Sequence, residues 1–139
     1  VQLDRVNLHH AFLAGANLRG ACLRNSDLRN ADLREADLRG VDFRGSTLCN
    51  ALCARADLTG ALLRGVPCAT DFTGAILCDA DFSGAVLTAS VLKACLLHGA
   101  DLRGEGLEEA ELDGAIYDRR TRWPAEFDPR TRGAVPVPE

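Results

Sequence analysis

Three residues at intervals of 20 carry the side chains that nucleophilic catalysis uses: Cys78, His98 and Asp118. A thiol, an imidazole and a carboxylate could act as nucleophile, general base and orienting group. The thiol and the imidazole could instead capture a metal ion at the surface. Catalysis requires that the side chains meet in a pocket, so the elements that position residues 20 apart must be worked out first.

The large apolar residues show a period of five. Such a residue, or a cysteine, stands at every fifth position from 3 to 68, and a small residue precedes most of them by two positions. The spacing falls to four between Cys68 and Phe72, beside Pro67, and then returns to five as far as Tyr117. A period of five rotates the apolar residue by roughly 140° per repeat of a helix. In a continuous strand it would alternate between the two faces.

Neither a helix nor a continuous strand would therefore keep the apolar residues on one face. A chain that turns a corner at each fifth residue would keep them all inside. In the phrase ADLR at 31–34, alternation then places Ala and Leu inside and Asp and Arg outside. Eleven of the 13 glycines, and three asparagines, lie two positions after an apolar centre, where a tight turn favours residues that tolerate positive φ. The sequence therefore predicts a coil of very short strands, each hydrogen-bonded to the next coil. The shortened spacing at Cys68–Phe72 indicates either a one-residue deletion absorbed at a corner or a kink that re-aims the two halves.

The phrase A-[D/N]-L-x-x, with 24 consecutive copies, resembles the pentapeptide-repeat family. The resemblance implies an all-β fold: a right-handed, four-sided parallel β-helix with four phrases per coil and about six coils. We expect the solenoid over residues 1–118 and a C-terminal capping tail over 119–139. In that tail, Trp123 and Phe127 should cover the last coil near Tyr117, and residues 133–139 should be loose. The N-terminal edge shows no evident cap.

With four phrases per coil, residues about 20 apart stack in columns on the outside. One side combines a column of arginines with a column of aspartates: Arg24, Arg44, Arg64 and Arg103 beside Asp42, Asp81 and Asp101. This side could recognise anions or dock a partner. Alternatively, it is a solvated face on which carboxylates neutralise stacked guanidinium groups, and this interpretation is favoured.

A second column changes character along the chain. Asn17, Asp37 and Asp57 are followed by Ile76, Leu96 and Ile116 at nominally outward sites. An apolar stripe on a solenoid wall needs a cover. The cover could be a partner protein, a second copy or the chain's own tail, and the last two are favoured.

The cysteines divide between the inside and the outside of the coil. Cys53, Cys68 and Cys95 fall at inward sites and are expected in the core. Cys22, Cys49 and Cys78 face outward on different columns, too far apart to form disulfides. Unpaired cysteines suit a reducing compartment, so we expect a cytoplasmic protein. Cys78, His98 and Asp118 share one column, but on a flat wall without a pocket, so we expect no catalytic, metal or cofactor site there.

The charge distribution bears on the class of partner. The formal net charge is −4, with no apolar run near 18 residues, so neither nucleic acid nor membrane is the expected partner. Residues 66–118 carry ten acids and two bases, and an acidic patch is expected near the last coil: Glu105, Glu108, Glu109, Glu111, Asp113 and Asp118.

Two functional hypotheses follow. The first is a non-catalytic protein-binding or scaffold module that could form a homodimer through a solenoid end or through the apolar stripe. The alternative comes from the resemblance, which implies that some members mimic DNA and modulate a type II topoisomerase such as DNA gyrase. The arginines of the N-terminal half fit that alternative poorly.

Overall fold

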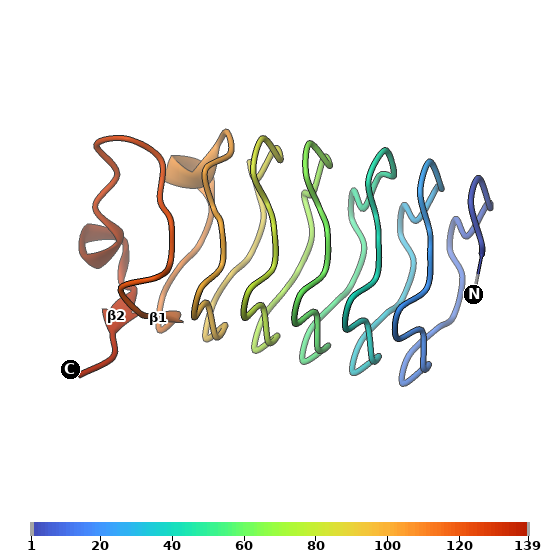
Figure 1. Ribbon diagram of the computed structural model, residues 1–139, viewed down its shortest axis with the longest axis horizontal. Helices are drawn as coiled ribbons and strands as arrows, with labels where there is room; N and C mark the ends of the chain where they lie inside the picture. The colour runs from blue at the N-terminus through green and yellow to red at the C-terminus, as the bar shows by residue number, and fades with distance from the viewer. Residues whose placement is uncertain (1, 139) are drawn as a thin grey trace.

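The computed structural model describes residues 2–138 as a rod of stacked coils that runs from one terminus to the other (Figure 1). Over the N-terminal half, bridged residues lie 20 positions apart and pair in parallel. The first coil pairs with the second at four positions, each of them the residue before an apolar centre: Gln2↔Cys22, Asn7↔Asp27, Phe12↔Asp32 and Asn17↔Asp37. The named elements all lie near the C-terminus: η1 Leu107–Glu109, β1 Ile116–Tyr117, η2 Pro129–Arg132 and β2 Val135–Pro136.

The strands are short because the hydrogen bonds of each phrase change direction within five residues. In the second coil, the Asp32 N–H donates to the Ala11 carbonyl of the coil before (2.9 Å), whereas the Leu33 N–H donates to the Leu52 carbonyl of the coil after (2.7 Å). The Ala36 N–H then closes the corner on the Leu33 carbonyl (3.1 Å). Most pairings between coils, which we call rungs, are therefore isolated β-bridges rather than extended strands.

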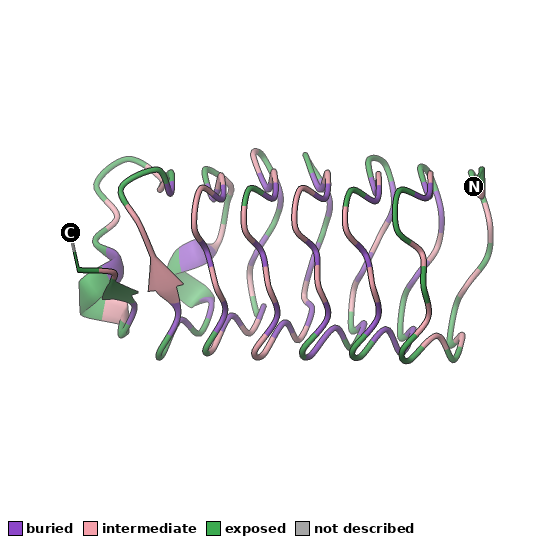
Figure 2. Ribbon diagram, turned by 60° about the horizontal axis from the view of Figure 1, so that its bottom comes forward, coloured by how far each residue is buried: buried purple, intermediate pink, exposed green. Residues whose placement is uncertain are grey.

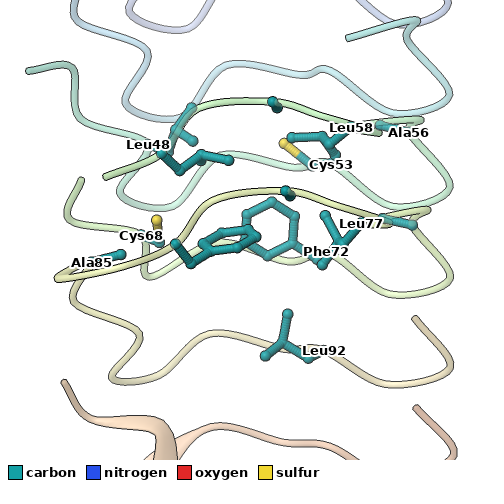
Figure 3. Packing of buried hydrophobic residues seen from close by; sticks show 14 of the residues in the cluster. Leu48, Cys53, Ala56, Leu58, Cys68, Phe72, Leu77, Ala85 and Leu92 are labelled. Atoms are coloured by element: carbon teal, nitrogen blue, oxygen red, sulfur yellow. The ribbon is translucent and has the colours of Figure 1, made fainter. Parts of the chain in front are cut away.

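The core is a continuous stack of aliphatic and aromatic side chains inside the coil. From the second coil onward, buried positions alternate with half-buried or exposed ones along the chain (Figure 2). Leu48, Leu58 and Leu77 are fully buried, and Leu77 lies on the coil after Leu58, on the same side of the core (Figure 3). Phe72 and Phe82 pack edge to face with their ring centroids 5.6 Å apart. Burying each large apolar side chain contributes about 2 kcal/mol, and the contribution depends on the neighbouring coils.

The corners adopt the predicted backbone conformation. With the exception of Gly104, the glycines and asparagines two positions after an apolar centre have positive φ, from 58° at Asn25 to 79° at Gly45. The shortened spacing also lies at a corner: Leu52 pairs with Asp71 and Pro67 with Val86, 19 residues apart. Figure 1 shows the coils continuing in line across it, which supports the interpretation as a one-residue deletion.

A second irregularity contradicts the expected phrase around residue 107. Glu105, rather than Gly106, pairs with Val86, and residues 107–109 form the 3₁₀ turn η1. Leu107 nevertheless stays buried. Gly106 has φ +77°, and a Cβ there would overlap Thr88 on the preceding coil. The segment therefore combines two requirements that glycine alone meets: positive φ and a close backbone approach.

Residues 133–138 pack on the last coil, so the expectation of a loose end is wrong for them, and residue 139 lies outside the described residues. β2 pairs in parallel with β1, with Ile116 opposite Val135 and Tyr117 opposite Pro136, and Ala134 is buried. Trp123 packs edge to face on Tyr117 (5.3 Å between centroids) and stacks on Phe127 (5.5 Å), and all three rings pack against the core.

The outer edge of β2 has no N–H groups to offer. The N–H groups of Val135 and Val137 donate to the preceding coil, at the carbonyls of Ala115 (2.7 Å) and Tyr117 (2.9 Å). Alternation along the strand turns the intervening positions toward the free edge, and these are Pro136 and Pro138. Proline has no N–H, so these two positions offer no main-chain donor at this edge of β2.

Candidate interaction surface

The aspartate of the repeat completes the hydrogen bonds of its own corner. The N–H of the first corner residue has no main-chain acceptor on either neighbouring coil. In the phrase at 31–35, Asp32 accepts this bond from the Arg34 N–H (3.1 Å) and also binds the Arg34 guanidinium at Nε (2.8 Å) and Nη2 (2.7 Å). The aspartate and the arginine two residues later are therefore one structural unit.

This unit recurs along the rod, with some substitution of the polar partner. The arginine form occurs in five phrases: Asp27–Arg29, Asp32–Arg34, Asp37–Arg39, Asp42–Arg44 and Asp101–Arg103. A hydroxyl replaces the guanidinium at Asp57–Thr59, Asp71–Thr73 and Asp81–Ser83. The side-chain hydrogen bond from Arg34 lowers the pKa of Asp32 to about 2, and Arg39 does the same for Asp37. Folding thus accounts for the outward aspartates.

The arginines of the predicted column also pair with aspartates, but not all of them within their own repeat. Arg44 binds Asp42 of its own phrase, whereas Arg24 and Arg64 follow Cys22 and Leu62 and so reach carboxylates on neighbouring coils. Arg24 lies 3.3 Å from Asp4, and Arg64 lies 3.4 Å from Asp81. The geometry favours a solvated, internally neutralised face, as the sequence indicated.

The cysteine–histidine–aspartate column does not form a catalytic set. The Cys78 Sγ lies 3.7 Å from His98 Nδ1, but the Asp118 carboxylate accepts from the Gly99 N–H (3.0 Å) and pairs with Arg120 (3.4 Å). Burial raises the pKa of the Cys78 thiol, which is the opposite of what an activated nucleophile needs. Within residues 2–138, no three histidine, cysteine, aspartate or glutamate side chains gather as a metal site would require.

The other cysteines lie where the period placed them. Cys53, Cys68 and Cys95 are buried, Cys22 and Cys49 are half-buried, and all are free thiols. Burial raises the pKa of Cys95 to about 12, so this thiol is a small core hydrophobe rather than a reactive group.

The apolar column forms a surface that we call the aliphatic stripe: Ile76, Leu96, Ile116 and Val135. Its members are bridged in sequence, Ile76↔Leu96, Leu96↔Ile116 and Ile116↔Val135. The first three are half-buried and Val135 is 51% exposed. The tail therefore lengthens the stripe by one rung rather than covering its outer face, contrary to one of our expectations. The alternation in AVPV at 134–137, with a buried small residue before an outward valine, was the signal for this rung.

The aliphatic stripe also leaves main-chain donors available. Ile76 and Leu96 occupy the position where an aspartate would accept the corner N–H, so they provide no acceptor. Among residues 2–138, the N–H groups of Cys78 and His98 have no protein acceptor. Two outward N–H groups on successive coils thus flank an apolar column.

The acidic residues near the C-terminal end are exposed. Glu105, Glu108, Glu109 and Glu111 lie in or beside η1, and Glu111 pairs with Lys93 at 3.7 Å. Arg132 of η2 donates to the Glu108 carbonyl, which ties the tail to this turn. A shallow cavity of about 760 Å³, which the sequence did not predict, lies where β1 and β2 end and is lined by Tyr117, residues 118–120 and residues 136–138.

Comparison with known protein families identifies the repeat. The family described as pentapeptide repeats matches eight copies over residues 2–40, 26–65 and 69–104. No curated protein matches the chain.

Among solved structures, a form of QnrB1, a plasmid-mediated fluoroquinolone resistance protein, is 20% identical with a TM-score of 0.48, over 87% of this chain and 74% of its own. The pentapeptide-repeat protein alr5209 from Nostoc PCC 7120 is 33% identical with a TM-score of 0.33, over 96% and 86%. Rfr23 from the cyanobacterium Cyanothece 51142 is 27% identical with a TM-score of 0.32, over 88% and 84%. Within residues 2–138, no helix has the length and apolar character to cross a membrane. The period of five, the stacked coils and the family match agree, and the chain belongs to the pentapeptide-repeat family.

Proposed function

We propose that this chain is a non-catalytic protein-binding module and that the aliphatic stripe is its binding face. One observation carries the proposal: four consecutive rungs present half-exposed or exposed aliphatic side chains where the preceding coils present Asn17, Asp37 and Asp57. An unbroken apolar column of this kind marks an interaction site.

The chemistry of the stripe favours a protein partner. At a spacing of about 4.8 Å per coil, four rungs span roughly 14 Å, which suits a short row of apolar side chains. The N–H groups of Cys78 and His98 can donate to carbonyl groups of the partner. The net charge of −4 and the nearby Asp79 and Asp118 disfavour phosphate groups, so neither nucleic acid nor an anionic membrane is the proposed partner.

An aspartate scan tests this face without endangering the fold. Leu96→Asp restores the residue type that the same column carries at Asp37 and Asp57, so the coil should keep its structure. Val91→Asp makes the same chemical change on the adjacent side of the same coil. Proteins retained by the immobilised wild type and by Val91→Asp, but lost with Leu96→Asp, would support the stripe. Equal retention by both variants would refute it.

Three structural details belong to the same proposal. The coil is right-handed with about six turns, the solenoid occupies residues 1–118, and residues 119–139 close it. The rungs Asp101↔Arg122 and Ile116↔Val135 support a closing segment that wraps the last coil. A cytoplasmic location is supported by the six free cysteines.

A second candidate function is modulation of a type II topoisomerase by mimicry of DNA, as the family resemblance implies. The observation that favours it is the exposed acidic end around η1 combined with the pairing of Arg29, Arg34, Arg39 and Arg44 to aspartates, which reduces their contribution to the surface potential. A supercoiling assay with purified DNA gyrase tests it. If micromolar protein neither inhibits DNA gyrase nor protects it, this function is excluded.

A further inference from the structure

Two side chains that can bind metal lie together on the side of the rod that carries the aliphatic stripe. The Cys78 Sγ and the His98 Nδ1 are 3.7 Å apart on successive coils, and both residues are half-buried. Among residues 2–138, this is the one hydrogen bond between a cysteine and a histidine. Thiolate sulfur and imidazole nitrogen are the ligands that zinc takes in structural sites.

Both side chains are available because the repeat changes at these two coils. On the preceding coil, the Asp57 carboxylate accepts from the Thr59 hydroxyl (2.6 Å), so the two polar groups satisfy each other within one phrase. In the next two phrases on this side, an aliphatic residue replaces the aspartate, and Cys78 and His98 replace the threonine. Neither residue has a carboxylate two positions before it, so the sulfur and the nitrogen remain free to bind a cation.

The separation of the two ligand atoms fits a shared metal ion. Zinc binds sulfur at about 2.3 Å and nitrogen at about 2.0–2.1 Å, so tetrahedral geometry separates two such ligand atoms by roughly 3.6 Å. The 3.7 Å between Cys78 and His98 matches this separation. Burial raises the pKa of the Cys78 thiol, but a metal ion displaces the proton of a coordinating thiol, and that proton passes to the solvent.

The carboxylates nearby favour a cation but are bound to other groups. Asp118 accepts from the N–H groups of Gly99 (3.0 Å) and Thr121 (3.1 Å). Arg120 lies 3.4 Å from Asp118 and 3.2 Å from Asp79, so it holds both carboxylates. One chain therefore supplies two ligands here, whereas a structural zinc site takes four.

A second copy of the chain can supply the other two ligands. A two-fold axis between the coils of Cys78 and His98, parallel to the strands of this side, places this side of each copy against the other. The axis reverses the direction of the second rod, so Cys78 of one copy meets His98 of the other. Likewise, Ile76 of one copy meets Leu96 of the other. Two thiolates then balance the two charges of Zn²⁺, which suits a contact between apolar surfaces.

We propose that Cys78 and His98 form half of a zinc site that a second copy of this chain completes, a proposal that rests on the proposed function only in making a second copy a partner of the aliphatic stripe. Ile76 and Leu96 pack in this contact, and two rungs cover only about 10 Å along the rod. Specific interfaces of standard size bury about 800 Å² per partner, so the apolar contact alone is too small for a stable dimer. Association therefore depends on the metal.

Sedimentation velocity of the reduced protein, in EDTA and with added Zn²⁺, tests the assembly, and titration calorimetry gives the stoichiometry. We expect a monomer in EDTA and, with zinc, a dimer that holds one metal ion per two chains. Co²⁺ provides a second readout. A charge-transfer band from thiolate to cobalt, together with intense d–d bands, marks a tetrahedral site with sulfur ligands.

Cys78→Ser and His98→Gln each remove one ligand and leave the aliphatic stripe unchanged. Each should weaken zinc binding at least about tenfold and leave a monomer, because the loss of even an outer partner of a ligand costs about 10–100-fold in affinity. Cys78→Ser should also abolish the charge-transfer band of cobalt. His9→Gln combined with Cys49→Ser is the matched control, since it removes one imidazole and one thiol from a single column on another side of the rod. This control should behave as the wild type does.

Three results would overturn the proposal: zinc affinity that is the same in wild type and Cys78→Ser, one zinc ion per chain without a dimer, or a dimer that persists in EDTA. A persistent dimer that Leu96→Asp dissociates and Cys78→Ser does not would overturn the zinc site while leaving the aliphatic stripe as the binding face. Failure of the proposed function is read separately, as equal retention of proteins by Leu96→Asp and Val91→Asp.

Discussion

Asp42 offers a way to separate the two roles of the outward aspartate. Its side chain is 16% exposed and accepts from the Arg44 N–H (3.0 Å), Nε (2.9 Å) and Nη2 (2.8 Å). Asp42→Ala removes every one of these bonds. Asp42→Asn keeps an oxygen for the N–H and loses the ion pair, and Arg44→Ala removes the guanidinium alone.

The expected costs follow from the environment of each bond. A hydrogen bond from a main-chain N–H to a carboxylate contributes about 1.5–3 kcal/mol, and its loss leaves the N–H at a constrained corner without a protein acceptor. An ion pair at the surface contributes about 0–1 kcal/mol. We therefore expect Asp42→Ala to lower the free energy of unfolding by about 2 kcal/mol, and both Asp42→Asn and Arg44→Ala by under about 1 kcal/mol.

Urea denaturation at neutral pH, followed by circular dichroism, measures the three differences. The slope of the unfolding free energy against urea concentration should be the same in all variants, so that differences in the midpoint report differences in stability alone. If Asp42→Asn costs as much as Asp42→Ala, the ion pair is the main contribution and the assignment of the aspartate to the corner N–H is wrong. A large loss in Arg44→Ala would lead to the same conclusion.

Three further predictions concern the core, an irregular corner and acid. Leu58→Asp places a carboxylate in the stacked interior and should unfold several coils together; a cooperative thermal melt at the wild-type midpoint would argue against a shared core. Gly106→Ala should lower stability by about 1–3 kcal/mol in the same assay, because a Cβ at φ +77° overlaps Thr88, whereas a neutral result would mean that the turn adapts. Lowering the pH should destabilise the fold between about pH 4 and 2, since Asp32 and Asp37 have pKa values of about 2 when folded against 3.8 ordinarily. Stability that these groups provide above pH 4 is lost as they are protonated, so a thermal midpoint that rises on acidification would contradict the assignment.

Much of the fold could be predicted because each phrase repeats the same local constraints. Leu33 and its equivalents alternate with polar residues, and a corner residue such as Gly40 accepts positive φ, so inside, outside and corners are readable from spacing. The regular phrase expected at Leu107 failed because Glu105 pairs one position early, and that register depends on the close approach of Gly106 to Thr88. Val86 and Glu105 pair across successive coils although they lie 19 positions apart in the chain. Such a contact leaves no recognisable pattern within one five-residue repeat.

The candidate surface was predicted less completely. Ile76, Leu96 and Ile116 could be found from the period, but Val135 lies after the repeat ends and joins the stripe only because β2 pairs with β1. The tail was expected to cover the stripe, since an apolar column needs a cover. Instead, the main-chain bonds of Val135 and Val137 to the last coil place the tail beside the stripe.

By itself, the sequence determined the period, the inward and outward positions and the unpaired state of the cysteines, because these follow from side-chain alternation and from turn residues within five positions. The tertiary structure alone decided which partner each polar group takes. Asp42 binds its own phrase through Arg44, whereas Arg24, after Cys22, must reach Asp4 on the neighbouring coil. The physical reason is that the corner N–H and the edges of the rod acquire their partners only when the coils stack, and stacking distance and register are properties of the whole chain.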